Sequence, residues 1–181
     1  MARAEEIPGI ASDLSFREAA ARAIETRSEE LFAHSEGVLD TEDIERVHAM
    51  RVATRRLRAV LEIFAPCFPS KEHGRVLKAV KRLADALGER RDPDVAIESL
   101  EGISAALPKE DRLGVSSLIG ELRRVQHAGN EGLVLELARV SDEGLHGWLM
   151  ELADAAHLPD EAAVSDAVED VALYPGEAVA S

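Results

Sequence analysis

The chain has 181 residues, about the size of one domain, and 46% of them are hydrophobic, so it can bury a core. Its apolar residues are mostly Ala, Leu and Val and only 3% of all residues are aromatic, which favours an all-helical domain over a sheet. The single cysteine, Cys67, excludes an intrachain disulfide and a multi-cysteine zinc site. No signal peptide and no run of about 18 apolar residues is evident, so we expect a cytoplasmic protein without a membrane partner.

Charge is distributed unevenly along the chain, whose net charge is −14. Residues 46–91 carry 12 Lys/Arg and 4 Asp/Glu, whereas residues 1–45 carry 4 and 12, and residues 92–181 carry 5 and 19. A basic centre between acidic flanks is a property that concerns binding partners rather than the fold.

Helical periodicity predicts a first helix over residues 12–36, after a flexible leader of residues 1–11. Ser12 or Asp13 could cap it. A second helix, capped by Asp40 or Thr41, is predicted to end near Pro66.

A third helix is predicted over residues 72–87 and is expected to end at Gly88. The sequence GERRDPDV then predicts a turn, with Asp92 as the cap and Pro93 as the first residue of a fourth helix over residues 93–107.

Pro108 separates this part from a predicted fifth helix over residues 110–130. A short helix over residues 132–140 and another over residues 141–157 complete the predicted domain, which spans residues 12–157. Residues 158–181 form an acidic tail that we expect to be partly disordered, with a helix possible over residues 160–173.

The predicted second helix contains the sequence ERVHAMRVATRRLRAVLEIF, residues 45–64. At about 100° per residue, its apolar side chains gather on one side and a basic row occupies a separate arc roughly 80° wide. This row consists of His48, Arg51, Arg55 and Arg58.

The predicted third helix repeats this arrangement, with an apolar face and a basic face. The basic face carries Arg75, Lys78 and Arg82, with Lys81 close to its edge. Like charges at (i, i+4) repel by a few tenths of a kcal/mol per pair, so such rows suit an anionic ligand better than a purely structural role.

Ordinary structural explanations remain open for these residues. The acidic flanks could neutralise the arginines, and His48 could be a buried histidine. The three acids Asp85, Asp92 and Asp94 suit the orientation of arginines and helix capping better than acid–base catalysis. The remaining histidines have no metal-ligand spacing and Trp148 suits a core position, so we expect no metal, cofactor or catalytic residue.

Two motifs, VHAMRVATRRLR and, after the third helix, LGERRDPDV, resemble those of the CHAD family, the conserved histidine α-helical domain. The resemblance implies an all-α fold of antiparallel helical bundles and binding of inorganic polyphosphate. It further implies that the first four-helix unit is complete and the second reduced, because the only candidate second repeat, LHGWLMELADAAHL, has His146 but no basic run. A homodimer could then complete the binding groove.

The resemblance also implies which residues face the ligand. These are His48, Arg51, Arg55 and Arg58, together with Arg56, then Arg75, Lys78, Lys81 and Arg82, and Arg91 of the second motif.

These observations predict a non-enzymatic polyphosphate-binding protein, with polyphosphate granules as its location. The alternative is a scaffold or accessory module for another phosphate polyanion, such as nucleic acid or a nucleotide, or for a partner protein. Scarce aromatic residues and the negative net charge disfavour nucleic acid. A polyphosphate or triphosphate hydrolase is the weakest reading, because no Glu-x-Glu-x-Lys motif is present.

Overall fold

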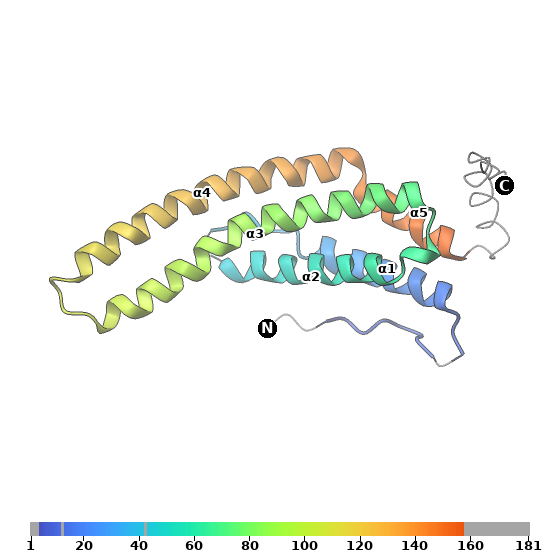
Figure 1. The fold of residues 1–181 in the computed structure, drawn as a ribbon, viewed down its shortest axis with the longest axis horizontal. Coiled ribbons are helices and arrows are strands. Elements are labelled where there is room, and N and C mark those ends of the chain that lie inside the picture. Colours follow the sequence, from blue (N-terminus) through green and yellow to red (C-terminus); the bar gives the residue numbers. More distant parts are fainter. Residues whose placement is uncertain (1–3, 12, 42, 158–181) are drawn as a thin grey trace, which may run out of the picture.

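The structure, a computed structural model, describes residues 4–11, 13–41 and 43–157, and every regular element in them is a helix. The prediction of an all-α fold of packed antiparallel helices is therefore confirmed (Figure 1). The elements are α1 (Phe16–Ala33), α2 (Ile44–Ile63), the short 3₁₀ helix η1 (Ala65–Cys67), α3 (Ser70–Ala106), α4 (Arg112–Glu143) and α5 (Leu145–His157).

The two longest helices, α3 and α4, run side by side in opposite directions as one hairpin (Figure 1). At one end of the molecule this hairpin packs with α1, α2 and α5 into a bundle. At the other end it projects beyond α1 and α2, so that residues near the α3–α4 turn have no other helix of the described residues beside them (Figure 1).

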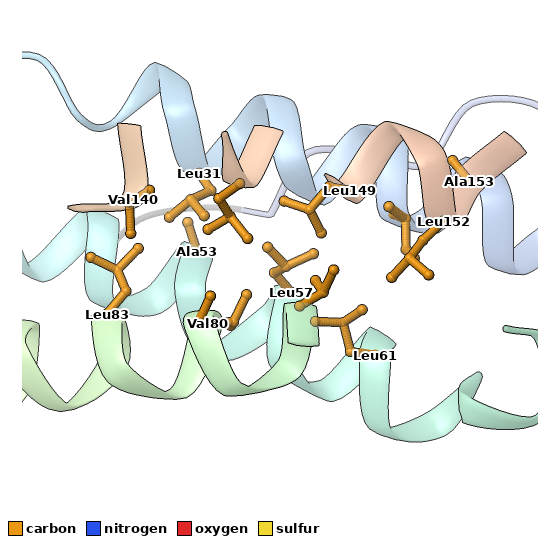
Figure 2. Close-up of a cluster of buried hydrophobic side chains, with 14 of the residues drawn as sticks. Leu31, Ala53, Leu57, Leu61, Val80, Leu83, Val140, Leu149, Leu152 and Ala153 are labelled. Carbon is orange, nitrogen blue, oxygen red and sulfur yellow. The ribbon is translucent and has the colours of Figure 1, made fainter. Parts of the chain in front are cut away.

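Side chains from all five α-helices meet in the core of the bundle (Figure 2). Leu57 of α2, Leu83 of α3 and Leu149 of α5 are each completely buried there. Burial of one such side chain contributes about 1.5–3 kcal/mol relative to its exposure, so the apolar faces of these helices account for much of the bundle's stability.

The first two helices begin later than the sequence predicted. Ser15 rather than Ser12 or Asp13 caps α1, in a capping box where its hydroxyl accepts from the Glu18 N–H and the Glu18 carboxylate accepts from the Ser15 N–H. Asp43 precedes α2 but makes no side-chain cap, because its carboxylate accepts a 2.9 Å hydrogen bond from Arg46 Nε. The predicted caps Asp40 and Thr41 lie outside the helix.

The predicted break between the third and fourth helices is wrong, because α3 continues through Gly88 and Pro93 to Ala106. Pro93 lacks the N–H that would bond to the carbonyl of Glu89, but an ion pair bridges the interruption. Arg90 Nη1 donates a 2.6 Å hydrogen bond to Asp94 Oδ1, with both side chains completely buried. Asp92 therefore lies inside a helix and does not cap one.

Side chains of helix α4 form hydrogen bonds with the Arg90–Asp94 pair of α3. Gln126 Nε2 donates to Asp94 Oδ1 at 2.6 Å, and Arg90 Nε donates to Asn130 Oδ1 at 3.1 Å. A Cβ on Gly129 would lie 3.0 Å from the Glu89 carbonyl oxygen, so glycine at this position lets α4 approach closely the carbonyl that Pro93 leaves without its helical donor. The segment RRDPD therefore lies inside α3 and does not form a turn. Its side chains form hydrogen bonds to α4.

The second half of the chain also differs from the prediction. Helix α4 is continuous over the predicted boundary near residue 131, and the break falls at Gly144 instead, which has a φ of +74° and ends the helix in the left-handed conformation. Cys67 is buried in η1, within the predicted connection between the second and third helices. The predicted tail, residues 158–181, lies outside the described residues.

Candidate functional site

Helices α2 and α3 lie side by side in opposite directions and are joined by two ion pairs. Arg51 is 4.0 Å from Asp92, and Lys81 is 3.9 Å from Glu62. Arg51 and Glu62 are eleven residues apart on α2, as are Lys81 and Asp92 on α3, so the two helices stay adjacent for roughly 16 Å at 1.5 Å per residue.

Six basic side chains of the two helices lie along this contact. We call them the basic surface, which consists of His48, Arg51, Arg55 and Arg58 of α2 and Lys78 and Lys81 of α3. Lys78, Asp85 and Asp92 recur every seven residues, which places Lys78 on the same side of α3 as Asp92, the partner of Arg51.

Three members of the basic surface have acidic partners, but these pairs are open to water. The side chains of Arg51, Arg58 and Lys81 are 45%, 43% and 45% exposed in their pairs with Asp92 and Glu62. Exposed ion pairs contribute only about 0–1 kcal/mol, so a stronger anion can displace them.

The other three members make no hydrogen bond or ion pair within the part of the chain that the structure describes. Arg55 and Lys78 are exposed, and His48 is partly buried. The basic surface therefore has cationic charge that the described fold does not neutralise.

Glu62 is a residue of this surface that the sequence analysis missed. Its Oε1 accepts a 2.9 Å hydrogen bond from Arg58 Nε, and this bond lowers the pKa of Glu62 despite an opposing effect of desolvation. Nearby Lys81 acts in the same direction. The signal was available, because Glu62 follows Arg55 by seven residues and so shares its face of the helix.

Arg75 and Arg82, predicted to face a ligand with Lys78, instead contact the second half of the chain. Arg82 donates to Glu136 at 3.0 Å and to Glu143 at 2.6 Å, both on α4. Burial alone would lower the pKa of Arg82, but these two hydrogen bonds outweigh it and raise the pKa. Arg75 reaches α5, where it lies 3.4 Å from Glu151 and stacks 4.2 Å above the ring of Trp148.

Arg56 lies on another side of α2, towards α1. It forms an ion pair with Glu30, a buried acid that also accepts a 2.5 Å hydrogen bond from Arg27. Two guanidinium groups thus neutralise one buried carboxylate between α1 and α2.

Arg91 is mostly buried beside the Arg90–Asp94 pair. Its Nη1 is 3.9 Å from Asp94 Oδ2, and neither atom has a hydrogen-bond partner. Arg91 therefore lies beside a buried acid rather than in the basic surface, while Arg90, which the sequence analysis did not select, is the residue that holds Asp94.

The described residues contain no group of three or more His, Cys, Asp and Glu side chains that could hold a metal ion. In the same residues, no helix is both long enough and apolar enough to cross a membrane.

Comparison with known proteins agrees with this architecture. No curated protein matches the sequence. The family model described as CHAD domain matches residues 22–173, which is most of the chain and includes the second half, where the motifs are weaker. The protein therefore belongs to the CHAD family, a family associated with polyphosphate binding.

Proposed function

We propose that the protein binds inorganic polyphosphate through its basic surface, without catalysing a reaction. Family membership supports this proposal, since CHAD domains are generally binding modules. The observation that carries it is the exposed row of Arg51, Arg55 and Arg58 on α2 beside Lys78 and Lys81 on α3, in which Arg55 and Lys78 have no acidic partner among the described residues.

The chemistry of the surface suits a linear polyanion. Polyphosphate presents a chain of charged oxygens, so its receptor needs several cationic donors in a line rather than one enclosed pocket. Arginine is suited to this role because its planar fork can donate two parallel hydrogen bonds to a phosphate group. His48 can donate from a ring N–H in either protonation state, and it adds positive charge when protonated.

The predicted ligand residues fall into three groups on this proposal. The basic surface contacts phosphate directly. Arg56 and Arg82 serve the fold through Glu30 on one side and through Glu136 and Glu143 on the other. Arg75 and Arg91 lie outside the surface, beside α5 and beside Asp94, and contribute to binding only through their positive charge.

Polyphosphate granules are the cellular location that this activity would give, because a granule concentrates the ligand. The acidic remainder of the chain, with net charges of −8 before the basic segment and −14 after it, would repel polyanions elsewhere on the protein. Binding is thereby confined to the α2–α3 surface.

Direct binding measurements with long-chain polyphosphate test the proposal. About five phosphate contacts at ~0.7 counterions each predict a slope of about −3 to −4 for log K against log salt concentration. Orthophosphate at equal phosphorus concentration should not compete, because it cannot span the row. Binding that is absent at low salt, or that single-stranded DNA displaces as effectively as polyphosphate does, would contradict the proposal.

Replacement of Glu62 by glutamine should strengthen polyphosphate binding. The substitution removes the negative charge beside Arg58 and Lys81 and leaves the side-chain shape nearly unchanged. We expect a roughly two- to fivefold lower dissociation constant at low salt, the scale of an exposed ion pair. The pKa of Glu62 is lowered, so the carboxylate stays ionised between pH 8 and pH 5. Acidification over that range therefore does not remove the negative charge that the substitution removes.

Glu98→Gln is the matched control, since Glu98 is an exposed acid of α3 on the projecting hairpin. It should leave the dissociation constant unchanged. Equal gains in both variants would assign the effect to net charge rather than to the basic surface.

A further inference from the structure

Helices α2 and α3 face each other in a register that their two ion pairs define. From the Arg51–Asp92 pair, a step of four residues along α2 reaches Arg55, and the same step back along the antiparallel α3 reaches Gly88. The second ion pair, at the other end of the contact, gives the same register. Arg55, which has no acidic partner among the described residues, therefore lies opposite a residue without a side chain.

The positions on either side of this point carry opposite charges across the contact. The same register places Arg58 opposite Asp85, so both arginines that flank Arg55 in the row face an acid of α3. Asp85 and Asp92 lie about one helical turn before and after Gly88. Gly88 is thus an uncharged gap between two acids, opposite the arginine that neither acid neutralises.

Gly88 lies at the inner side of the contact. At 100° per residue, the α3 positions that face α2 occupy an arc roughly 60° wide, and Gly88 is the one nearest to the buried face that carries Leu83 and Leu87. A Cβ at Gly88 would nevertheless meet nothing within 4 Å beyond its own stretch of helix. The other described glycines with such open space, Gly102 among them, are exposed, whereas Gly88 is partly buried. A partly buried backbone therefore borders a space that side chains do not fill.

Three arginines of α2 surround this space. Arg51 and Arg58 are seven residues apart, about 10 Å along the helix, and they lie before and after the position of Gly88. Arg55 lies between them on the outer side of α2, where it is exposed. The N–H of a helix interior already bonds within the helix, so Gly88 supplies space and the arginines supply the donors.

Close packing of two helices, the ordinary reason for a glycine at a helix contact, does not account for Gly88. Packing requires atoms of the neighbouring helix near the missing Cβ, as at Gly129, where the Glu89 carbonyl oxygen would be 3.0 Å away. Gly88 has no such neighbour, and glycine in a helix interior lowers stability relative to alanine. The residue therefore costs stability without a packing gain, which suits a position that needs space for a ligand.

We propose that Gly88 forms a notch in the α2–α3 contact that seats one phosphoryl group of the bound polyphosphate chain. The ligand follows the basic row of α2 and approaches α3 at Gly88 and then, about 10 Å further on, at Lys81. Asp85 and Asp92 repel it from the stretches of α3 on either side of the notch. This inference rests on the proposed function and makes an uncharged residue a determinant of how the ligand fits.

Replacement of Gly88 with alanine and with leucine in the full chain tests the inference. The dissociation constant for long-chain polyphosphate should rise about threefold in Gly88→Ala and about tenfold in Gly88→Leu, because the added atoms fill the notch. Both variants should melt at a higher temperature than the wild type, since alanine and leucine favour a helix more than glycine does. Weaker binding by a more stable protein is a combination that loss of structure does not produce.

The matched controls are Gly102→Ala and Gly102→Leu. Gly102 lies in the same helix and also has open space at its Cβ, but it belongs to the projecting hairpin, away from α2 (Figure 1). These variants should gain thermal stability and keep the wild-type dissociation constant. Equal weakening at both positions, or Gly88→Leu binding within about twofold of the wild type, would overturn the inference.

A second measurement combines Gly88→Leu with Arg55→Ala. If the notch seats the phosphoryl group that Arg55 binds, leucine should weaken binding less than about twofold once Arg55 is absent. A full tenfold loss in that background would mean that leucine acts elsewhere, and the inference would be wrong. A wild-type chain that does not bind polyphosphate contradicts the proposed function as well. Binding that depends on the arginines but tolerates Gly88→Leu contradicts the notch alone.

Discussion

Simultaneous replacement of Arg51, Arg55 and Arg58 with alanine should weaken binding of long-chain polyphosphate about 100-fold at 0.1 M salt. This estimate assigns roughly 1 kcal/mol to each exposed arginine–phosphate contact, with 1.4 kcal/mol for each factor of ten. The salt dependence should fall as well, by about two units of slope, because three fewer contacts at ~0.7 counterions each release about two fewer counterions.

The fold should tolerate this triple substitution. The ion pairs that it removes, with Asp92 and Glu62, are exposed, and Arg55 has no partner among the described residues. Far-UV circular dichroism and the melting temperature, measured together with binding, would separate a lost contact from a lost fold.

A matched variant carries Lys109→Ala, Arg123→Ala and Arg124→Ala. It changes the net charge by the same amount, but its residues are exposed on the projecting hairpin, away from α2. We expect less than a threefold change in affinity for this control. Equal weakening in both triple variants would place polyphosphate binding elsewhere or make it a matter of overall charge.

Asp94→Ala should have the largest effect on stability, lowering the free energy of unfolding by about 3–5 kcal/mol. The substitution leaves the completely buried guanidinium of Arg90 without its 2.6 Å partner and removes the acceptor of Gln126. It also removes the bridge across Pro93, where α3 lacks a backbone hydrogen bond. Because small domains are stable by only about 5–15 kcal/mol, much of the protein should be unfolded at 37 °C.

Urea denaturation of Asp94→Ala beside Asp92→Ala measures this effect. Asp92 is two residues away in the same motif but 77% exposed, and its loss should cost less than about 0.5 kcal/mol. The Arg90→Met, Asp94→Leu double variant should recover part of the stability, because it leaves no unpaired charge in the core. Similar costs for Asp92→Ala and Asp94→Ala would show that burial of the ion pair is not what secures α3.

The sequence was sufficient to predict the all-helical class, the family and the amphipathic second helix, because these depend on local periodicity. It failed at GERRDPDV, where glycine and proline are strong local signals for a turn. The helix continues there because Arg90, Asp94, Gln126 and Asn130 form hydrogen bonds between two helices, and two of those partners lie more than 30 residues away in the sequence.

Contacts between distant parts of the chain also decide which basic residues are free to face a ligand. Arg82 and Lys81 are neighbours in the sequence and both are predicted to face a ligand, yet Arg82 pairs with acids 54 and 61 residues further along the chain. Helical periodicity can place a charge on a face, but it does not identify the element that this face meets. Lys78 and Lys81 could be separated from Arg75 and Arg82 only once the positions of α4 and α5 were known.

The first and last described helices are packed against each other, and this has a consequence for how the protein folds during synthesis. Arg17 of α1 donates hydrogen bonds of 3.2 and 2.9 Å to the carbonyl oxygens of Ala156 and Ala155, 139 and 138 residues away, at the end of α5. Helix α1 therefore cannot complete its packing until α5 has left the ribosome. Until then its apolar face stays available to chaperones, and native structure is acquired after translation of the domain rather than progressively from its N-terminus.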